Sequence, residues 1–172
     1  MIESRTGKMG SGLIDLIRYM NLVHAIIVEV GSYKGDSALI FAQYFDVVYC
    51  VDAWEQRTFN VPDTMATDAE REFDRKTGAF MHIKKCKGRS LDVAKHFGAA
   101  DVVYIDASHD YESVRADILA WGPHVHRFLC GHDYWPRRFP GVVQAVNELL
   151  DKPDAVFEDT SWVKEVRGDA RS

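Results

Sequence analysis

Residues 28–37 read Val-Glu-Val-Gly-Ser-Tyr-Lys-Gly-Asp-Ser, and this stretch decides the fold. It ends the apolar run 25–30 and leads into the amphipathic segment 36–43. A buried strand, a glycine turn and a helix in this order are typical of sheets that helices cover on both faces. Gly31 lets the backbone turn sharply and lets a ligand approach without a Cβ atom in the way, and Gly35 would allow the following helix to pack tightly. The stretch therefore predicts a ligand site at the carboxyl end of the first strand.

Short β-rich runs alternate with amphipathic helical segments along the rest of the chain. The expected strands are 25–30, 47–51, 80–84, 101–105, 127–130, 155–158 and 162–166. The expected helices are 13–20, 36–43, 67–76, 91–96, 111–121 and 142–150. This alternation predicts an α/β fold, a doubly wound Rossmann-like sheet of seven strands with right-handed crossovers. The last two strands are too close in sequence for a helical crossover, so the mostly parallel sheet should end in a C-terminal antiparallel hairpin.

Length and composition predict one soluble, mildly acidic domain over residues 1–172, with an N-terminal helical segment within 1–24. Twenty-one Lys and Arg residues against 26 Asp and Glu residues give a net charge of −5, which argues against general nucleic-acid binding. No apolar run is long enough to cross a bilayer, and no segment has the pattern of a secretion signal. The three cysteines are widely spaced and none belongs to a CxxC motif, so we expect a reduced, cytoplasmic protein.

The positions of the cysteines and of one polar segment in the sequence lead to two further predictions. Cys50 and Cys130 fall within predicted strands and Cys86 just after one, so we expect them to pack in the apolar interior. Residues 55–76 form the one long polar stretch, with a loop expected at 60–64 and a helix after it. This segment is either a lid over a ligand site or a solvated connection.

Two acidic residues belong to the predicted ligand site. Asp52 ends the second strand, 21 residues after Gly31, where a carboxylate can accept two hydrogen bonds from a ribose diol or can act as an ordinary turn residue. Glu29 lies inside an apolar strand, where an unpaired charge is costly, so it needs a cationic partner or several donors. A ligand ammonium group or a pair of loop N–H groups would supply them. Tyr33 stands where a G-x-G-x-x-G motif has its middle glycine, which counts against NAD or FAD.

Four more polar side chains follow the fourth and fifth predicted strands. Asp106 closes the fourth strand with His109 three residues later, and His132 and Asp133 close the fifth. These strand ends are neighbours in a parallel sheet, so the four side chains could converge on one cleft. Carboxylate oxygens with an imidazole nitrogen suit a divalent cation of the Mg, Mn or Fe kind. The alternatives are helix or loop capping for the two aspartates and an ordinary loop hydrogen bond for His109.

A histidine at such a cleft is also a candidate general base. His24, His82 and His96 lie in or beside elements remote from these strand ends, and His124 and His126 are placed in the loop before the fifth strand. A hydroxyl is a poor nucleophile until a base near neutral pKa, or a metal, draws off its proton. That leaves His109 and His132, and His132 is better placed for a metal or a cofactor carboxylate, so His109 is the predicted base.

Four motifs stand in order along the chain, each at the end of a predicted strand. They are Glu29-x-Gly31-x-x-x-Gly35, Val51-Asp52-Ala53-Trp54, Tyr104-Ile105-Asp106-Ala107-Ser108-His109-Asp110-Tyr111 and Cys130-Gly131-His132-Asp133-Tyr134. Together they resemble the class I S-adenosylmethionine-dependent methyltransferases. The chain looks most like the small subgroup that includes macrolide-sugar O-methyltransferases and cephalosporin-hydroxylase-like proteins, over about residues 25–150.

The resemblance implies a set of residues around S-adenosylmethionine. Gly31, Ser32 and Tyr33 would contact its methionine part, and Asp52 would hold the ribose hydroxyls. Trp54 would line the adenosine pocket, or would be an ordinary loop-anchoring aromatic. The cofactor-contacting set implied in this way is Glu29, Gly31, Ser32, Tyr33, Gly35, Asp52, Ala53, Trp54, Arg89, Ser90 and Asp106.

The implied reaction is O-methylation of a small molecule or a sugar hydroxyl. By the resemblance, the catalytic residues would be His109, as the base, and Asp106. One Mg or Mn ion would be held by Asp106, His132 and Asp133. Relatives of this kind have an acidic pair at the second place, so His132 leaves one fewer hard oxygen ligand and lowers the expected affinity for Mg²⁺.

Two other functions fit the same scaffold, because one sheet hosts many chemistries. One is a hydroxylase-like relative, and the other is a non-catalytic cofactor-binding module that a partner completes. Recognition of a small-molecule acceptor could reside in residues 55–76, in the N-terminal helix or in a second subunit of a homo-oligomer.

Overall fold

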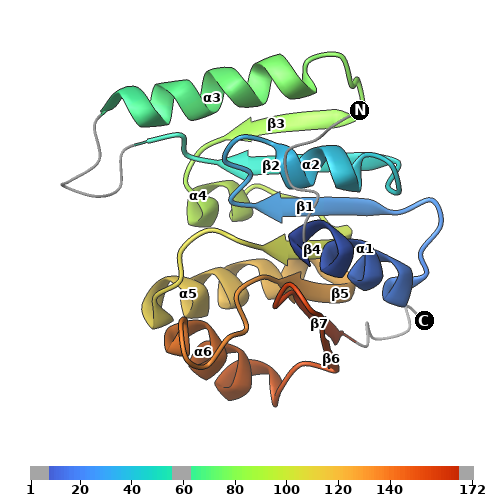
Figure 1. Ribbon diagram of the computed structural model, residues 1–172, viewed down its shortest axis with the longest axis vertical. Coiled ribbons are helices and arrows are strands. Elements are labelled where there is room, and N and C mark those ends of the chain that lie inside the picture. The colour runs from blue at the N-terminus through green and yellow to red at the C-terminus, as the bar shows by residue number, and fades with distance from the viewer. Residues whose placement is uncertain (1–7, 56–62, 167–172) are drawn as a thin grey trace.

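The computed structural model describes residues 8–55 and 63–166, and these form one seven-stranded sheet between two layers of helices (Figure 1). The strands are β1 (Ile26–Val30), β2 (Val47–Asp52), β3 (Ile83–Lys87), β4 (Ala100–Ile105), β5 (Val125–Gly131), β6 (Ala155–Val156) and β7 (Trp162–Glu165). The helices are α1 (Lys8–Met20), α2 (Asp36–Phe41), α3 (Asp63–Thr77), α4 (Ser90–Ala94), α5 (Tyr111–Trp121) and α6 (Pro140–Leu150), with a 3-10 turn η1 (Gly122–His124).

The strand order is β3-β2-β1-β4-β5-β7-β6, which confirms the predicted fold class. The first five strands pair in parallel, and β7 pairs antiparallel with both β5 and β6. The predicted C-terminal hairpin is therefore present, with its second strand inserted between β5 and β6. The order of the strands reverses between β1 and β4, so the carboxyl ends of these two strands flank the switch point of the sheet, where α/β proteins bind ligands.

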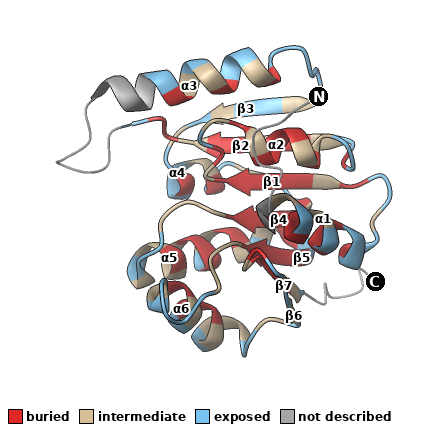
Figure 2. Cartoon of the chain, in the orientation of Figure 1, coloured by how far each residue is buried: buried red, intermediate tan, exposed pale blue. Residues whose placement is uncertain are grey.

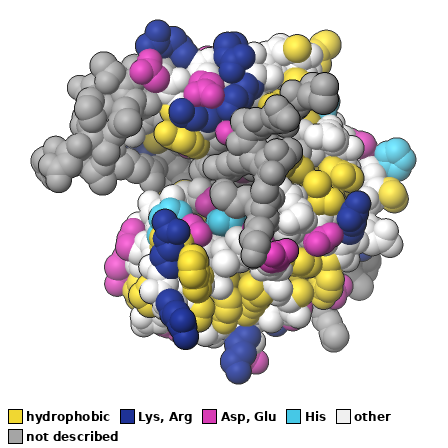
Figure 3. Space-filling model, in the orientation of Figure 1, with side chains coloured by type: hydrophobic (Ala, Val, Ile, Leu, Met, Phe, Trp, Pro, Cys, Tyr) yellow, Lys and Arg dark blue, Asp and Glu magenta, His cyan; other side chains and the backbone are white. Residues whose placement is uncertain are grey.

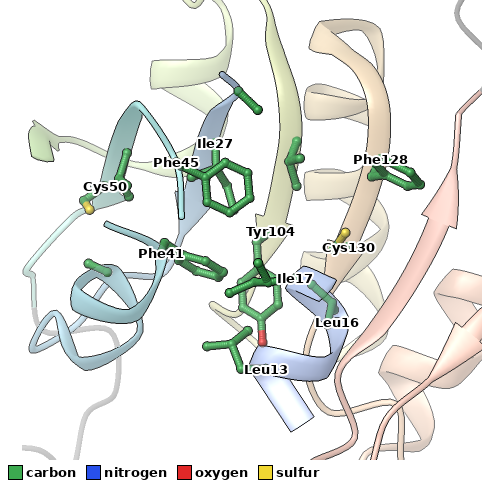
Figure 4. Packing of buried hydrophobic residues seen from close by; sticks show 14 of the residues in the cluster. Leu13, Leu16, Ile17, Ile27, Phe41, Phe45, Cys50, Tyr104, Phe128 and Cys130 are labelled. Atoms are coloured by element: carbon green, nitrogen blue, oxygen red, sulfur yellow. The ribbon is translucent and has the colours of Figure 1, made fainter. Parts of the chain in front are cut away.

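Each face of the sheet has its own apolar core, because successive strand residues point to opposite sides. In β1, Ile27 packs with helices α1, α2 and α3, whereas Val28 packs with α4, α5 and α6. In β4, Tyr104 joins the first core, where Figure 4 shows its ring beside Ile17 and its hydroxyl pointing toward Leu13 of α1. Buried residues accordingly make up most of β1, β4 and β5, while α3 has an exposed outer side (Figure 2).

Strand β3 occupies residues 83–87, three residues later than the sequence predicts. The apolar residues Phe80 and Met81 suggested a strand there, but both side chains are exposed and the backbone turns after α3. The strand itself reads Ile-Lys-Lys-Cys-Lys and lies at the edge of the sheet. Lysines are common on edge strands, because they discourage pairing with other chains. Here they interrupt the apolar run by which a buried strand is predicted, so the strand was not predicted at these residues. Cys86 consequently lies within the strand, not after it, and is only partly buried.

Smaller corrections concern the ends of other elements. Strand β5 begins at Val125, so His126 lies in the strand and not in a loop before it. The predicted strand 155–158 is reduced to two residues, Ala155 and Val156. Helix α3 begins at Asp63, so the last two residues of the expected 60–64 loop are helical, and residues 60–62 lie outside the described part. Cys50 and Cys130 are buried, as expected.

Helix α3, which contains most of the described part of segment 55–76, packs against α2 and the glycine turn. Ion pairs join helix α3 to α2 and to the glycine turn, with Lys76 Nζ 2.7 Å from Asp36 Oδ1 and Lys34 Nζ 3.0 Å from Glu72 Oε2. Residues 56–62, the middle of the candidate lid, lie outside the described residues. Among the described helices, none is long and apolar enough to span a bilayer.

Candidate functional site

A cleft of about 340 Å³ opens at the carboxyl ends of β1, β2 and β4. Figure 3 shows histidine and acidic side chains gathered where the surface is hollowed in this region. Of the predicted site residues, eight line the cleft: Gly31, Ser32, Tyr33, Asp52, Ala53, Ser90, Asp106 and His109. Lys34, Asp36, Ser37, Glu55, Ala107 and Ser108 also line it and were not predicted. The switch point of the sheet is thus the place that brings the motifs together.

The glycine turn has the geometry that its sequence requires. Gly31 has a φ of +98°, and a Cβ atom there would lie 2.2 Å from the backbone oxygen of Asp106. Gly31 therefore allows the loops after β1 and β4 to touch. Gly35 has a φ of +79°, and a Cβ atom there would lie 2.9 Å from the Phe73 ring of α3. The tight packing predicted for Gly35 is therefore against helix α3.

Asp52 holds two loops of the cleft in place. Its Oδ2 accepts a hydrogen bond from the Tyr33 N–H at 2.9 Å, and its Oδ1 accepts one from the Trp54 N–H at 2.7 Å. Each carboxylate oxygen can accept a second hydrogen bond, so the ability to bind a diol remains. Tyr33 itself is about half exposed and has a φ of +44°, so the residue in the middle-glycine place reaches the mouth of the cleft.

Glu29 is a fully buried acid beneath the glycine turn. Its Oε1 accepts a hydrogen bond from the hydroxyl of Ser37, on the first turn of α2, and its Oε2 has no partner among the described residues. Burial raises the pKa of Glu29 to about 7, although the hydroxyls of Ser32 and Ser37 act in the opposite direction. The expected need for donors is thus met in part by the Ser37 hydroxyl. The cost of a buried charge is also reduced, because Glu29 stays protonated up to near-neutral pH.

Asp133 joins the two candidate histidines. Its Oδ2 lies 3.0 Å from His109 Nδ1, and its Oδ1 lies 3.1 Å from His132 Nδ1. The residue has a φ of +62°, which turns its side chain back toward the loop after β4. The Phe139 ring, whose centroid is 4.7 Å from that of His109, packs against the imidazole. His109 is therefore held on two sides at the edge of the cleft.

The pKa shifts follow from this arrangement. The hydrogen bond to Asp133 raises the pKa of His109 above 6.5. Burial alone would raise the pKa of Asp133, but the hydrogen bonds from His109 and His132 outweigh it and hold that pKa well below its usual range. Asp133 is therefore a carboxylate. It accepts a hydrogen bond from the Nδ1–H of His109, and this leaves Nε2 as the basic nitrogen of the ring.

Asp106, His132 and Asp133 lie close enough to share an ion. One ligand atom of each lies within 4.8 Å of the others. His132 faces small cavities beside the main cleft, between Asp106 and the core. Helix α5 is capped by Asp110 and not by Asp106, with Asp110 Oδ1 2.9 Å from the Ser113 N–H. The donor set fits a divalent cation, provided that His132 is neutral.

Three predicted residues have mainly structural surroundings. Trp54 is buried on Phe73 and donates its Nε1–H to the Tyr33 carbonyl at 2.7 Å, which supports the loop-anchoring alternative. Ser90 donates to Asp117 at 2.5 Å within the core, although it also reaches the cleft. Arg89 is exposed and borders a neighbouring groove.

The sequence reasoning missed Ser37 as the partner of Glu29 and Asp133 as the partner of His109. A hydroxyl inside the otherwise apolar run Ser37–Phe41 was the available signal for Ser37. No such signal exists for Asp133, because its direction depends on an unusual φ angle.

The solved structures most useful for comparison are methyltransferases. The O-methyltransferase NovP aligns with a TM-score of 0.63 at 16% identity, over 94% of this chain and 78% of its own. CalS11, a TDP-rhamnose 3'-O-methyltransferase of calicheamicin biosynthesis, aligns with a TM-score of 0.61 at 16% identity, over 91% and 77%. Fibrillarin from Aeropyrum pernix, solved with bound S-adenosylmethionine, aligns with a TM-score of 0.62 at 10% identity, over 92% and 76%. At such identities the likeness shows a shared fold.

Sequence comparisons identify the family. Curated protein sequences give no significant match. A family model described as a methyltransferase domain matches residues 28–134, which run from the glycine turn to the loop that carries Asp133. That match covers more than half of the chain and every strand end of the cleft, so this protein belongs to the methyltransferase-domain family.

Proposed function

We propose that this protein is an S-adenosylmethionine-dependent methyltransferase that methylates a hydroxyl group of a small molecule or a sugar. The observation that carries the proposal is the His109–Asp133 pair at the edge of a cleft formed by the glycine turn and Asp52. Neighbours of the same fold include a TDP-rhamnose 3'-O-methyltransferase, and another neighbour, fibrillarin, holds S-adenosylmethionine. The macrolide-sugar subgroup is the finer assignment that we propose.

The cleft residues fit the cofactor in shape and in donor chemistry. Gly31 leaves the backbone of the turn open to the ligand, and Asp52 has free acceptor capacity for ribose hydroxyls. The unpartnered Oε2 of Glu29 lies beneath the turn as a further polar atom. When bound, S-adenosylmethionine supplies an electrophilic methyl group on a sulfonium ion.

His109 provides the chemistry on the acceptor side. Its Nε2 would take the proton of the acceptor hydroxyl as that oxygen accepts the methyl group, with the sulfur–methyl bond breaking and S-adenosylhomocysteine leaving, while Asp133 would stabilise the resulting imidazolium. Phe139 and Asp133 fix the ring, so little orientational freedom is lost when the acceptor binds. His109 is thus the group that accepts the proton, and Asp133 remains a carboxylate that orients and stabilises the ring.

We also propose that Asp106, His132 and Asp133 hold one divalent cation, Mg²⁺ or Mn²⁺. Asp133 can serve both purposes, because Oδ1 faces His132 and Oδ2 faces His109. A cation there would acidify an acceptor hydroxyl beside the base. The same cluster favours the hydroxylase-like alternative, which would need the metal and would not transfer a methyl group.

Calorimetry and a labelled-methyl assay test the proposal. We expect binding of S-adenosylmethionine and of S-adenosylhomocysteine, no binding of NAD, and transfer of label to hydroxyl-bearing acceptors in a mass-spectrometric screen. Binding without transfer to any acceptor would favour the non-catalytic module. Absence of cofactor binding would contradict the proposal.

A further inference from the structure

A turn of unusual composition borders the candidate base. Residues 135–139 read Trp-Pro-Arg-Arg-Phe and begin two residues after Asp133. The Arg138 N–H donates to the Trp135 carbonyl at 3.0 Å, and Pro136 occupies the second position of this turn, where its fixed φ favours turning. Trp135, Arg137 and Arg138 are all exposed. The turn therefore presents one large aromatic face and two guanidinium groups to solvent.

A continuous stack connects this turn to His109. The Arg138 guanidinium lies 5.9 Å from the Trp135 ring centroid and 5.2 Å from that of Phe139. Phe139 in turn packs on His109 at 4.7 Å, and the Trp135 N–H donates to the Asp133 carbonyl at 2.7 Å. The turn is thus fixed to both members of the candidate base pair. Arg138 and the His109 imidazole therefore both contact the ring of Phe139.

The positive charge of this turn is not neutralised by a carboxylate of the described residues. Within residues 8–55 and 63–166, many Lys and Arg side chains have a carboxylate within 4.0 Å, as in Lys34–Glu72 and Arg115–Glu148, whereas Arg137 and Arg138 form no ion pair. Figure 3 shows Lys or Arg side chains beside the histidines of the hollow, next to hydrophobic ones. The two arginines thus form a local positive site in a chain whose net charge is −5.

We propose that this turn recognises an acceptor linked to a nucleoside diphosphate, with the diphosphate on Arg137 and Arg138 and the base stacked on Trp135. This inference rests on the proposed function, since it names the substrate class of the same site. Guanidinium groups bind phosphate oxygens through paired hydrogen bonds, and they can do so while stacked on aromatic rings. An exposed indole offers a stacking face to a nucleobase. The sugar end of such a ligand would then lie beside His109.

Calorimetry with UDP tests the inference, with uridine and inorganic pyrophosphate as partial probes. The protein is first saturated with S-adenosylhomocysteine, so that the nucleotide cannot occupy the cofactor site. The test variants are Arg137→Ala/Arg138→Ala and Trp135→Ala. The matched control is Arg18→Ala/Arg127→Ala, which removes two exposed arginines, one on α1 and one on β5, that do not line the cleft. Thermal unfolding checks that every variant is folded, and the single variant Arg137→Ala replaces the pair if it is not.

We expect UDP to bind more tightly than uridine or pyrophosphate. The Arg137→Ala/Arg138→Ala protein should bind UDP at least tenfold more weakly, while the control changes less than twofold. Trp135→Ala should weaken binding of UDP but not of pyrophosphate. Equal binding of UDP and pyrophosphate, or unchanged affinity without the two arginines, would overturn the inference. If S-adenosylhomocysteine binds and UDP does not, this inference alone fails; if S-adenosylhomocysteine does not bind, the proposed function fails and the inference with it.

Discussion

Replacing Glu29 by glutamine should change how the stability of the protein depends on pH. The side chain is fully buried, and its pKa is raised from an ordinary 4.5 to about 7 in the folded state. Between these pH values the folded protein keeps the proton and the unfolded chain has lost it. Unfolding therefore releases a proton, and the free energy of unfolding falls as the pH rises.

The magnitude follows from the two pKa values. Each pH unit between them costs about 1.4 kcal/mol, so the wild-type protein should lose about 3 kcal/mol in all, of which about 2.5 kcal/mol falls between pH 5 and pH 8. Glutamine has no proton to lose, and its Oε1 can still accept the Ser37 hydroxyl hydrogen bond. Glu29→Gln should thus gain about 2.5 kcal/mol relative to the wild type between pH 5 and pH 8, whatever its stability at pH 5.

Urea unfolding of both proteins at the two pH values measures this difference, and taking the difference between proteins cancels the titration of every other group. Glu112→Gln, on the exposed side of α5, controls for the loss of a surface carboxylate. If the stability gap between wild type and Glu29→Gln is the same at pH 5 and pH 8, the argument from burial is refuted.

Four further predictions concern the cleft. Asp52→Ala should weaken S-adenosylmethionine binding by about 1–3 kcal/mol in calorimetry, and an unchanged affinity would sink the ribose assignment. His109→Ala should lower the rate of methyl transfer about 10²–10⁴-fold with little change in cofactor affinity. The rate of the wild-type protein should fall as the pH drops below the raised pKa of His109, because the protonated ring cannot act as a base. Mg²⁺ or Mn²⁺ titrated into chelator-treated protein should release or absorb heat that Asp106→Asn/Asp133→Asn abolishes; identical traces would mean that these acids hold no ion. Gly31→Ala should lower the free energy of unfolding by at least about 2 kcal/mol in urea, since its Cβ would lie 2.2 Å from a backbone oxygen, and a wild-type stability would show that the loops can move apart.

The parts of the fold that the sequence predicts well are those buried on both faces. Strands β1, β2 and β4 are almost continuous runs of Val, Ile and Tyr, because both faces of each meet a helix layer. Strand β3 was predicted three residues too early, since an edge strand with three lysines has no such run. Apolar patterning reports burial, and it fails where a strand is only partly buried.

The candidate site also has features that the sequence predicts and features that it does not. The chain order and spacing of Gly31, Asp52 and Asp106 were enough to predict that they share a cleft, because parallel strands end at one edge. The contact between Asp133 and His109 depends on a left-handed backbone angle in a loop, and the burial of Trp54 depends on packing with Phe73. Both are tertiary features that the spacing of residues does not contain.

The insertion of β7 between β5 and β6 also has a consequence for the order in which the molecule is built during translation. Residues 162–165 are made after all the other elements, yet they pair with residues 128–131 inside the sheet. Before they emerge from the ribosome, β5 is an open edge of apolar residues, which is where nascent chains aggregate. The loop after β5 also depends on this hairpin, because the Tyr134 N–H donates to the Thr160 carbonyl at 3.0 Å. A nascent chain that ends before this hairpin therefore lacks the support that positions Asp133, and the pair of His109 and Asp133 gains that support only after β7 has been made.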